Sequence, residues 1–401
     1  MDQFTSAGGE LLVNGIPVSR LAAMAGSTPF YAYDRSVVER RLGELRGLLP
    51  PGVQLHYAMK ANPMPALACF MASRVDGMDV ASAGELRIAL DAGVAPSRIS
   101  FAGPGKSEDA LRQALAAGVL LNAESGREID TLARLSDETG WPARVAVRVN
   151  PDFELRAAGM RMGGGAKPFG VDAEQVPALL RRISALGLGF EGFHVYAGSQ
   201  NLNADSLIDM QRRSLSLLLR LASDAPCAPR LLNLGGGFGI PYFPGERRLD
   251  VAPVCAALGG LVDEARRGLP GVELALELGR YLVGEAGVYV CRIIERKPSR
   301  GHVFLVADGG MHHHLAASGN FGQVIRRNYP VAIANRMDVP PGEAVSVVGP
   351  LCTPLDLLAD KVGLPAAGAG DFVVIFQSGA YGHSASPLGF LGHPEPVQML
   401  V

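Results

Sequence analysis

Three residues at the ends of short apolar runs carry side chains that react or exchange protons. They are Lys60 in HYAMKANP, His194 in FHVYAGSQ and Glu277 in LELGRYLV. The Lys60 ammonium is costly to enclose in an apolar fold unless it is solvated, paired or covalently bonded. Its amine could condense with an aldehyde carbonyl. A solvent-exposed lysine at the end of a strand is the alternative interpretation.

Glu277 and His194 are suited to a planar aromatic cofactor. Glu277 could hold a pyridine nitrogen protonated, which makes pyridoxal phosphate a strong electron acceptor. It could instead only pair with an arginine such as Arg148. His194 could stack on such a ring, or it could be a hydrogen-bonded core histidine.

A glycine triplet, Gly235, Gly236 and Gly237, follows an apolar run in LGGGFGIPY. Because glycine lets the main chain approach a ligand closely, backbone N–H groups here could surround a phosphate. A tight turn is the alternative. The chain holds 50 glycines in 401 residues, and we expect part of this excess to serve a phosphate cradle. The glycine-rich segment GMRMGGGAKPFG, residues 159–170, which contains Gly163–Gly165, predicts a mobile lid.

The elements that must position these residues alternate regularly. Most segments between the β-rich runs have helical periodicity, which predicts parallel βαβ units. Eight such units favour a closed (β/α)8 barrel, in which strand ends with polar residues meet on one face. An open doubly wound sheet is the alternative. The eight runs are Leu55–Lys60, Met78–Ser82, Ile99–Gly103, Val119–Ser125, Arg144–Asn150, Phe190–Ser199, Arg230–Gly237 and Glu273–Arg280.

After Arg280 the pattern changes to β-branched runs separated by glycine and proline turns. This predicts an antiparallel C-terminal β-domain over 281–401 after a barrel domain over 28–280. Residues 1–27 are expected to pack on the β-domain. His312, His313 and His314 suggest a metal site, but adjacent residues on a strand point to opposite faces. We therefore predict no metal.

Composition narrows the function classes. With 37 Lys+Arg against 39 Asp+Glu, the formal net charge is -2, which gives no electrostatic signature of nucleic-acid or membrane binding. No apolar run is long enough for a membrane helix, and the N-terminus lacks signal-peptide features. The five cysteines are scattered, which is typical of reduced thiols. We expect a cytoplasmic protein.

The motifs together resemble one family. YAMKANP, MDVASAGEL, HVYAGSQ, LGGGFGIPY, ELGRYLV, VGPLCTPLD and SGAYG occur in order along nearly the whole chain. They resemble the fold-type III pyridoxal-phosphate decarboxylases, the ornithine/diaminopimelate/arginine decarboxylase group, with an alanine-racemase-like barrel. GMRMGGGAKPFG, DGGMHHHLAASG and CTPLD are most similar to the exosortase-associated branch and to decarboxylases of carrier-protein-linked amino acids.

The resemblance implies a role for each matching residue. Lys60 would form the internal aldimine with pyridoxal 5'-phosphate, His194 would stack on its ring, and Glu277 would bind its pyridine nitrogen. Asp79 and Arg148 would support the cofactor. Cys352 would protonate the substrate carbon across a head-to-tail homodimer with shared active sites, and Thr353 and Asp356 would contact substrate beside Arg280 and Tyr381. The expected phosphate ligands are Ser199, Gly235, Gly236, Gly237, Gly279, Arg280 and Tyr381.

Glu277 favours decarboxylation over racemisation. Alanine racemases carry an arginine facing the pyridine nitrogen, whereas a carboxylate there stabilises the carbanion left by CO2 loss. The expected reaction is PLP-dependent decarboxylation of an amino acid or carrier-linked aminoacyl group through an external aldimine and a quinonoid. An amino-acid racemase, a non-catalytic PLP-binding protein and a PLP-free barrel enzyme are the alternatives.

Two positions depart from the family pattern. Thr353 replaces the acidic residue that reads a distal amino group in enzymes acting on basic amino acids, and a neutral hydroxyl cannot hold a buried ammonium equally well. We therefore expect poor activity on free lysine, ornithine or diaminopimelate. Leu278 replaces a proline and alters turn rigidity only. Four arginines could read an acidic or phosphopantetheine-like substrate or could be surface charges: Arg156, Arg161, Arg326 and Arg327.

Overall fold

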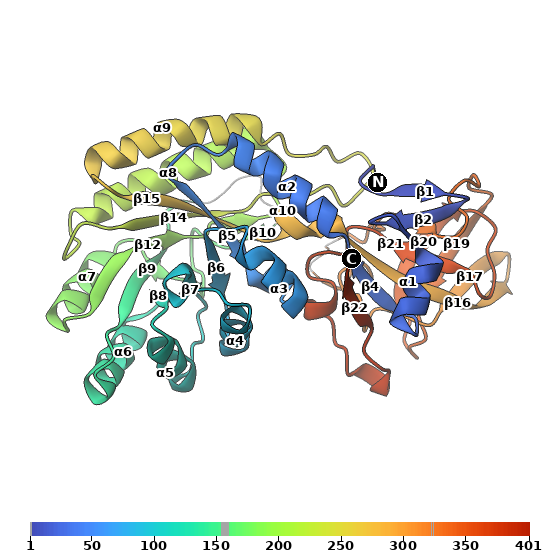
Figure 1. The fold of residues 1–401 in the computed structure, drawn as a ribbon, viewed down its shortest axis with the longest axis horizontal. Coiled ribbons are helices and arrows are strands. Elements are labelled where there is room, and N and C mark those ends of the chain that lie inside the picture. Colours follow the sequence, from blue (N-terminus) through green and yellow to red (C-terminus); the bar gives the residue numbers. More distant parts are fainter. Residues whose placement is uncertain (1, 154–159, 322, 324) are drawn as a thin grey trace. The chain divides into compact units, whose positions relative to one another are not determined.

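The computed structural model describes residues 2–153, 160–321, 323 and 325–401. The chain forms two compact units, coloured by sequence in Figure 1. The barrel unit comprises residues 42–240 and 247–279, and the β-unit comprises residues 1–41, 241–246 and 280–401. Each unit is described separately below.

The barrel unit contains a closed parallel barrel. Its strands pair in the order β5-β6-β7-β8-β9-β12-β14-β15 and close by pairing of β15 with β5, so the (β/α)8 prediction is confirmed and the open sheet is excluded. Each strand begins or ends within a few residues of its predicted run. The strands are β5 (Val53–Ala58), β6 (Gly77–Val80), β7 (Ile99–Phe101), β8 (Leu120–Ala123), β9 (Arg144–Asn150), β12 (Gly189–Val195), β14 (Leu231–Gly236) and β15 (Glu273–Leu278).

Amphipathic helices connect successive barrel strands, and a further one, α2 (Arg35–Leu48), precedes β5. Serine caps begin two of them as capping boxes: the Ser82 hydroxyl accepts from the Glu85 N–H, and the Ser125 hydroxyl accepts from the Glu128 N–H. The helices are α2 (Arg35–Leu48), α3 (Pro65–Ala72), α4 (Ala83–Asp91), α5 (Glu108–Ala117), α6 (Gly126–Thr139), α7 (Val176–Ala185), α8 (Ala204–Ala222) and α9 (Ala252–Gly268). Short strands β10 (Met160–Arg161), β11 (Val171–Asp172) and β13 (Gly198–Ser199) and the 3-10 turns η1 (Met59–Ala61) and η2 (Pro96–Arg98) complete the unit.

The β-unit is built around a mixed sheet. Most neighbours are antiparallel, as predicted for this domain, while β17 with β19 and β22 with β4 are parallel, so the sheet is mixed. Its sheet strands are β4 (Phe30–Tyr33), β16 (Gly287–Ser299), β17 (His302–Ala307), β18 (Val331–Ile333), β19 (Glu343–Val348), β20 (Leu357–Leu364), β21 (Phe372–Ile375) and β22 (Val397–Leu400). Helix α10 (Arg280–Val283) and the turns η3 (Gly284–Ala286), η4 (His383–Ala385) and η5 (Phe390–Gly392) flank it.

The N-terminal segment belongs to the core of the β-unit. It forms a small sheet of β1 (Thr5–Ala7), β2 (Glu10–Val13) and β3 (Ile16–Pro17), followed by helix α1 (Val18–Ala25). Its apolar side chains share one buried cluster with residues of β4, β16 and β21. Burial of these side chains is what holds the segment to the sheet.

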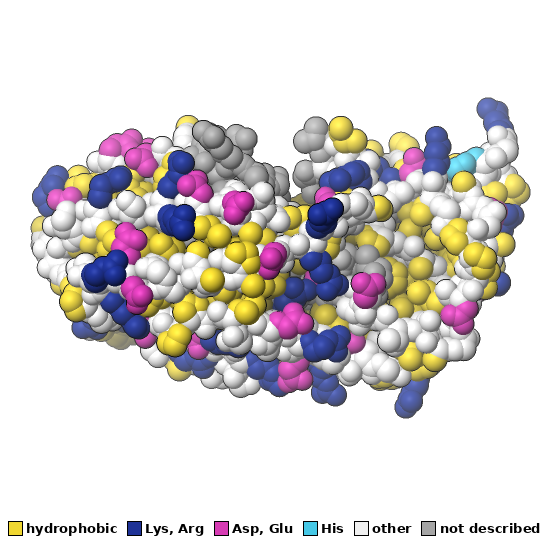
Figure 2. Space-filling view, turned by 90° about the horizontal axis from the view of Figure 1, so that it is seen from above, with side chains coloured by type: hydrophobic (Ala, Val, Ile, Leu, Met, Phe, Trp, Pro, Cys, Tyr) yellow, Lys and Arg dark blue, Asp and Glu magenta, His cyan; other side chains and the backbone are white. Residues whose placement is uncertain are grey.

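The surface is mixed in charge. On the face shown in Figure 2, basic and acidic side chains are interspersed, as the formal net charge of -2 leads one to expect. Across the described part of the chain, no helix is both long and apolar enough to span a membrane.

Candidate active site

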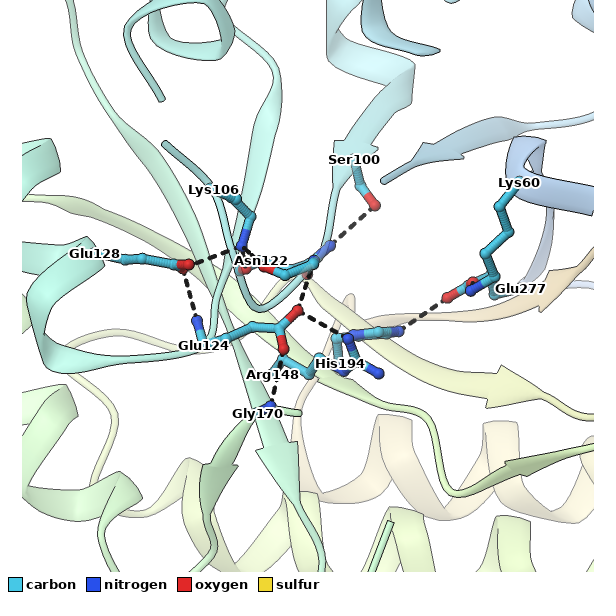
Figure 3. Close-up of polar contacts among 11 residues, drawn as sticks. Lys60, Ser100, Lys106, Asn122, Glu124, Glu128, Arg148, Gly170, His194 and Glu277 are labelled. Atoms are coloured by element: carbon cyan, nitrogen blue, oxygen red, sulfur yellow. Dashed lines mark hydrogen bonds and ion pairs between the residues drawn. The ribbon is translucent and has the colours of Figure 1, made fainter. Parts of the chain in front are cut away.

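Lys60, His194 and Glu277 meet at the carboxyl ends of barrel strands (Figure 3). Lys60 lies in η1 directly after β5, His194 is on β12 and Glu277 is on β15. The Lys60 Nζ donates to Glu277 Oε1 at 3.0 Å, and His194 Nε2 lies 3.0 Å from Glu277 Oε2. Both carboxylate oxygens therefore face a nitrogen that sequence reasoning had singled out.

Glu277 is held as a carboxylate. It is 4% exposed, and burial alone raises the pKa of its carboxyl. The nearby Lys60 charge and the contacts from His194 outweigh burial, so the pKa of Glu277 lies well below its ordinary value. Lys60 also sits 4.6 Å from the centre of the Tyr196 ring. The set thus combines an amine, an ionised carboxylate and two aromatic rings.

Asp79 lies on β6 and is buried. Its Oδ1 receives the Ser100 hydroxyl at 2.6 Å and faces His56 Nδ1 at 3.1 Å. Its Oδ2 is buried and, among the described residues, has no hydrogen-bond partner. The carboxylate is fixed through one oxygen and keeps acceptor capacity on the other.

Arg148 on β9 is buried and paired with Glu124, at the end of β8. Its Nη1 donates to Glu124 Oε1 at 2.8 Å, and its guanidinium lies 5.1 Å from the centre of the Phe169 ring. Glu124 also accepts the N–H groups of Gly103 and Gly170. Burial raises the pKa of the Glu124 carboxyl, but the charges of Arg148 and Lys106 lower it by more than burial raises it. The pKa of Glu124 therefore lies below its ordinary value.

A second lysine, Lys106, contacts the residues that surround Glu124. Lys106 Nζ is buried and donates to Glu128 at 3.0 Å and to the carbonyls of Gly103 and Asn122. Burial lowers the pKa of Lys106. Glu128 in turn accepts the Glu124 N–H in the capping box of α6. Lys106 is therefore committed to structure, in contrast to Lys60.

The glycine triplet ends β14, and close backbone packing requires glycine at its three positions. Gly235 and Gly237 have φ of +71° and +83°, and an added Cβ would come within 2.5 Å of the Val195 carbonyl oxygen at Gly235 and 2.7 Å of that of Gly198 at Gly237. At Gly236 it would overlap the carbonyl oxygen of Glu277. The triplet therefore brings the main chain close to the strand that carries Glu277.

Two further predicted residues flank this region of the barrel unit. A Cβ at Gly279 would lie 2.8 Å from that of Ala61, one residue after Lys60. Ser199 lies on β13, opposite Met160 of β10. Glycine at position 279 thus lets the end of β15 approach the turn that holds Lys60.

Arg280 and Tyr381 come together in the β-unit. The Arg280 guanidinium lies 4.6 Å from the centre of the Tyr381 ring, and its Nη1 donates to the Tyr242 hydroxyl at 2.7 Å. Its Nε is buried and has no partner among the described residues. Tyr381 itself has a φ of +55°, a conformation that is uncommon for a bulky side chain. The geometry leaves Arg280 a donor for an anionic group.

Cys352, Thr353 and Asp356 lie on one turn of the β-unit. Cys352 is exposed, and the Thr353 hydroxyl accepts from the Leu355 N–H at 3.3 Å. Asp356 is buried, and its two oxygens accept the N–H groups of Met311 at 2.6 Å and Leu351 at 2.8 Å. Asp356 thus ties the Cys352 turn to the segment before the three histidines.

The three histidines lie in a turn, not on a strand, so the strand geometry assumed for them is wrong. In the described residues, no group of three or more His, Cys, Asp or Glu side chains is arranged to hold a metal ion. His312 is fully buried, and both its ring nitrogens lack a hydrogen-bond partner there.

The four arginines considered for substrate recognition divide into two groups. Arg326 donates to the carbonyls of Ser318 and Leu357, and Arg327 pairs with Glu246 at 3.0 Å. Arg156 and the side chain of Arg161 lie outside the described residues.

Most of the predicted lid, residues 160–170, is described. The Asn150 side chain bonds to the backbone of Gly164 and Gly165, and the Glu124 carboxylate accepts the N–H of Gly170.

Sequence reasoning missed His56, Lys106 and Tyr242 as parts of these networks. The signal for His56 was a polar residue inside the run LHYA, at a position that alternates toward the barrel interior. Nothing in the local pattern marks Lys106 or Tyr242, because their charged partners, Glu128 and Arg280, lie 22 and 38 residues away.

The donor set fits pyridoxal phosphate. Lys60 supplies a primary amine, Glu277 an ionised carboxylate and His194 a buried ring whose Nδ1 has no partner among the described residues. An aldehyde, a pyridine nitrogen and a ring face each have a matching group among these barrel residues. Within the β-unit, the Arg280 Nε is a buried, positively charged donor of the kind that binds a phosphate.

Comparisons with known proteins agree with this chemistry. Residues 35–284 match the family model of the pyridoxal-dependent decarboxylase pyridoxal-binding domain. An L-glutamyl-(BtrI acyl-carrier protein) decarboxylase of Niallia circulans is 40% identical over 93% of this chain and 88% of its own. The diaminopimelate decarboxylase of Aquifex aeolicus is 30% identical over 94% of this chain and 87% of its own.

Solved structures share the architecture. AQ1208 from Aquifex aeolicus superposes with a TM-score of 0.84 at 28% identity, covering 99% of this chain and 92% of its own. A diaminopimelate decarboxylase from M. jannaschii, in co-complex with L-lysine, has a TM-score of 0.85 at 24% identity, with coverages of 99% and 92%. The latter shows the fold alone.

These findings confirm the predicted cofactor, the decarboxylase activity on an amino-acid substrate and the alanine-racemase-like barrel, and nothing in them favours a racemase. The amine, carboxylate and histidine that were predicted to react lie at the carboxyl ends of β5, β15 and β12. The chain belongs to the family of pyridoxal-dependent decarboxylases.

Proposed function

We propose that this enzyme decarboxylates a glutamyl group carried on an acyl-carrier protein as a thioester of its side-chain (γ) carboxyl, which leaves the α-carboxylate free to depart as CO2. The contacts of Glu277 with Lys60 and His194 carry the proposal for the reaction. For the substrate, the support is Thr353, a neutral residue in place of the family's acidic one, together with the 40% identity to a carrier-protein glutamyl decarboxylase. Neither observation calls for a substrate with a distal ammonium.

When bound, pyridoxal phosphate supplies a ring that accepts the electron pair left as CO2 departs. Lys60 is the amine that would bind the cofactor's aldehyde carbon, and His194 would pack against its ring. Glu277, kept ionised by its neighbours, would keep the pyridine nitrogen protonated. Asp79 and Arg148 would support the cofactor from β6 and β9.

The phosphate is assigned to backbone and cationic donors. We infer that Ser199, the Gly235–Gly237 triplet and Gly279 present the main chain to it. Arg280 contributes its Nε, which has no other partner among the described residues, and Tyr381 contributes its hydroxyl. Because these donors are held in fixed positions, they would orient the cofactor without having to rearrange when it binds.

Proton return to the α-carbon is assigned to Cys352 or Lys60. The exposure of Cys352 suits a thiol that serves a second copy of the chain, so we propose a head-to-tail homodimer in which Cys352 of the partner subunit completes each site. In this proposal Thr353 contacts the substrate. Asp356 contributes through the turn that it fixes, and its predicted direct contact with substrate stays a prediction.

The domain organisation and cellular setting complete the proposal. The segment 28–280 is proposed as the cofactor domain, with 281–401 and 1–27 as the β-domain. We expect a cytoplasmic enzyme whose partners are its substrate and carrier protein, without nucleic acid or membrane.

A CO2-release assay with matched substrates tests the substrate class. The substrates are acyl-carrier protein loaded with L-glutamate through its γ-carboxyl, γ-L-glutamyl-S-pantetheine, free L-glutamate and free meso-diaminopimelate. We expect the carrier-bound thioester to exceed the free amino acids in kcat/KM by roughly 10²-fold or more, because remote contacts contribute binding energy to the reaction. Equal or faster turnover of diaminopimelate, lysine or ornithine contradicts the substrate proposal.

A further inference from the structure

His56 lies on β5 with its ring inside the barrel, nearer the amino end of the strand than Lys60. It is 5% exposed. Its Nδ1 is 3.1 Å from Asp79 Oδ1, and its Nε2 is 3.0 Å from Gln54 Oε1. Both ring nitrogens are therefore within hydrogen-bonding distance of an oxygen.

The partners of His56 determine how many protons its ring carries. Gln54 donates its amide N–H to the Glu273 carboxylate, so the amide oxygen is the atom that faces His56. A carboxylate oxygen can only accept, and Asp79 Oδ1 already accepts the Ser100 hydroxyl. Both His56 nitrogens must therefore donate, whereas a neutral imidazole has one N–H.

Ser100 cannot reverse this assignment. Its oxygen accepts the Asn122 amide N–H at 3.0 Å, a contact drawn in Figure 3, and its own proton points to Asp79. The hydrogen-bond chain from Asn122 through Ser100 to Asp79 thus runs in one direction. Asp79 Oδ1 is left with donors only.

We propose that His56 is an imidazolium ion-paired with Asp79 and acts as a positioning residue that holds this carboxylate charged for the cofactor. The role assigned to Asp79 rests on the proposed function. With Oδ1 saturated by His56 and Ser100, the buried Oδ2 keeps its acceptor capacity. His56 reaches the cofactor only through Asp79.

The surroundings of His56 support a charged ring. The acidic groups that face it are Asp79 on β6, Glu277 on β15 and Asp76 just before β6. Burial lowers the pKa of His56, but the attraction of these carboxylates outweighs burial and the pKa is raised. Gly77 pairs with His56 across β5 and β6, and a Cβ there would lie 2.6 Å from His56 Nε2. The glycine gives the ring its space.

Solvent reaches the pair from the barrel end opposite Lys60. His56 and Ser100 line a cavity of about 330 Å3 formed by the first residues of several strands, among them Gln54, Arg144 and Glu273. Lys60 follows the carboxyl end of β5. The His56–Asp79 pair can therefore exchange protons with water without passing through the cofactor site.

Histidine side-chain NMR of the full-length protein at pH 7.5 tests the charge state. We expect the His56 resonances, assigned by their loss in His56→Gln, to show both ring nitrogens protonated. A single-protonated ring overturns the proposal. His302, which is partly buried beside the Ser346 hydroxyl, provides an internal comparison, because its partner in the described part of the chain is a hydroxyl and not a carboxylate.

Cofactor titration of the apoprotein tests the positioning role. His56→Phe keeps the ring volume and removes both donors, so we expect the Kd for pyridoxal phosphate to rise about tenfold or more, with His56→Gln intermediate. The wild type should also lose affinity as pH rises through the raised pKa of His56, and this limb should be absent in His56→Phe. The control variant His302→Phe should match the wild type.

The outcomes separate the two proposals. An unchanged Kd and pH profile in folded His56→Phe and His56→Gln, checked by circular dichroism, overturns the positioning role. If Asp79→Asn binds the cofactor as the wild type does, the role assigned to Asp79 fails and the positioning role falls with it. In that case the NMR measurement still decides whether the ion pair exists.

Discussion

The two units handle buried histidines in opposite ways. In the barrel unit, His194 faces Glu277 and His56 faces Asp79, each at about hydrogen-bonding distance from a carboxylate. In the β-unit, His312, His313 and His314 are equally buried but meet other rings, a serine hydroxyl and backbone groups. Burial lowers the pKa of His312 to about 3, of His313 to about 4 and of His314 to about 3.

The difference teaches what a carboxylate partner does for an enclosed imidazole. Without one, desolvation favours the neutral ring, and the histidine packs as an aromatic side chain. With one, the ring can donate from both nitrogens and fix the carboxylate that a cofactor needs. Of these histidines, we therefore assign a role in the cofactor site to His194 and His56, which face carboxylates.

Removing the carboxylate of Glu277 should have the largest effect. In Glu277→Gln the amide cannot keep a pyridine nitrogen protonated, so we expect the rate of CO2 release to fall roughly 10³-fold at saturating cofactor. The control Glu264→Gln alters an exposed carboxylate on α9 and should leave the rate unchanged. A fall of less than tenfold in Glu277→Gln would contradict the assigned role.

A clash with the backbone of Glu277, with its side chain kept, should reduce the stability of the fold. In Gly236→Ala the new Cβ would overlap the carbonyl oxygen of Glu277, and we expect a loss of about 3 kcal/mol in unfolding free energy. Gly47→Ala is the matched control, because its Cβ meets open space on helix α2. There we expect a gain of about 0.5–1 kcal/mol. Urea denaturation of both variants measures the contrast, and equal stabilities would refute the packing argument.

Acidification should destabilise the protein through the three neutral histidines. Their folded pKa values lie below the unfolded value of about 6.5, so the unfolded chain binds more protons and stability falls as pH drops below that value. Each contributes up to about 1.4 kcal/mol per pH unit. His56 has the opposite sign: its raised pKa gives stability that is present below pH ~6.5 and is lost as pH rises through the folded value. Denaturant midpoints between pH 5 and 8 measure both limbs.

The smallest expected effect on stability is that of replacing His312. Both its ring nitrogens lack partners among the described residues, so His312→Phe should cost at most about 1 kcal/mol at pH 7.5. It should also remove its share of the acid-dependent loss. If His312→Phe leaves the slope unchanged, His312 is not one of the titrating groups.

The sequence was most informative where a pattern is local. The eight barrel strands follow from apolar runs that alternate with amphipathic helices, and the capping boxes at Ser82 and Ser125 are visible as S-x-x-E. Lys60, His194 and Glu277 could be singled out because each closes such a run. The parallel pairing of β22 with β4 could not, because it joins residues from opposite ends of the chain.

Partner choice inside the fold was the part that sequence could not provide. Arg148 pairs with Glu124 and not with Glu277, because strand register and side-chain direction, not residue type, decide which acid it meets. Asp356 looks like a substrate residue in CTPLD, yet its two oxygens hold backbone amides. His56 needed the positions of Gln54, Ser100 and Asp79 before its charge could be inferred.

Borohydride reduction tests the central claim, that Lys60 is the amine that binds the cofactor. The holoenzyme is reduced, digested and mapped by mass spectrometry. We predict a pyridoxyl group on the peptide that contains Lys60 and none in Lys60→Ala, whose CO2 release should also be lost. A label on Lys106, which is buried in its own ion pair with Glu128, or on any other lysine with Lys60 unmodified, would contradict the account.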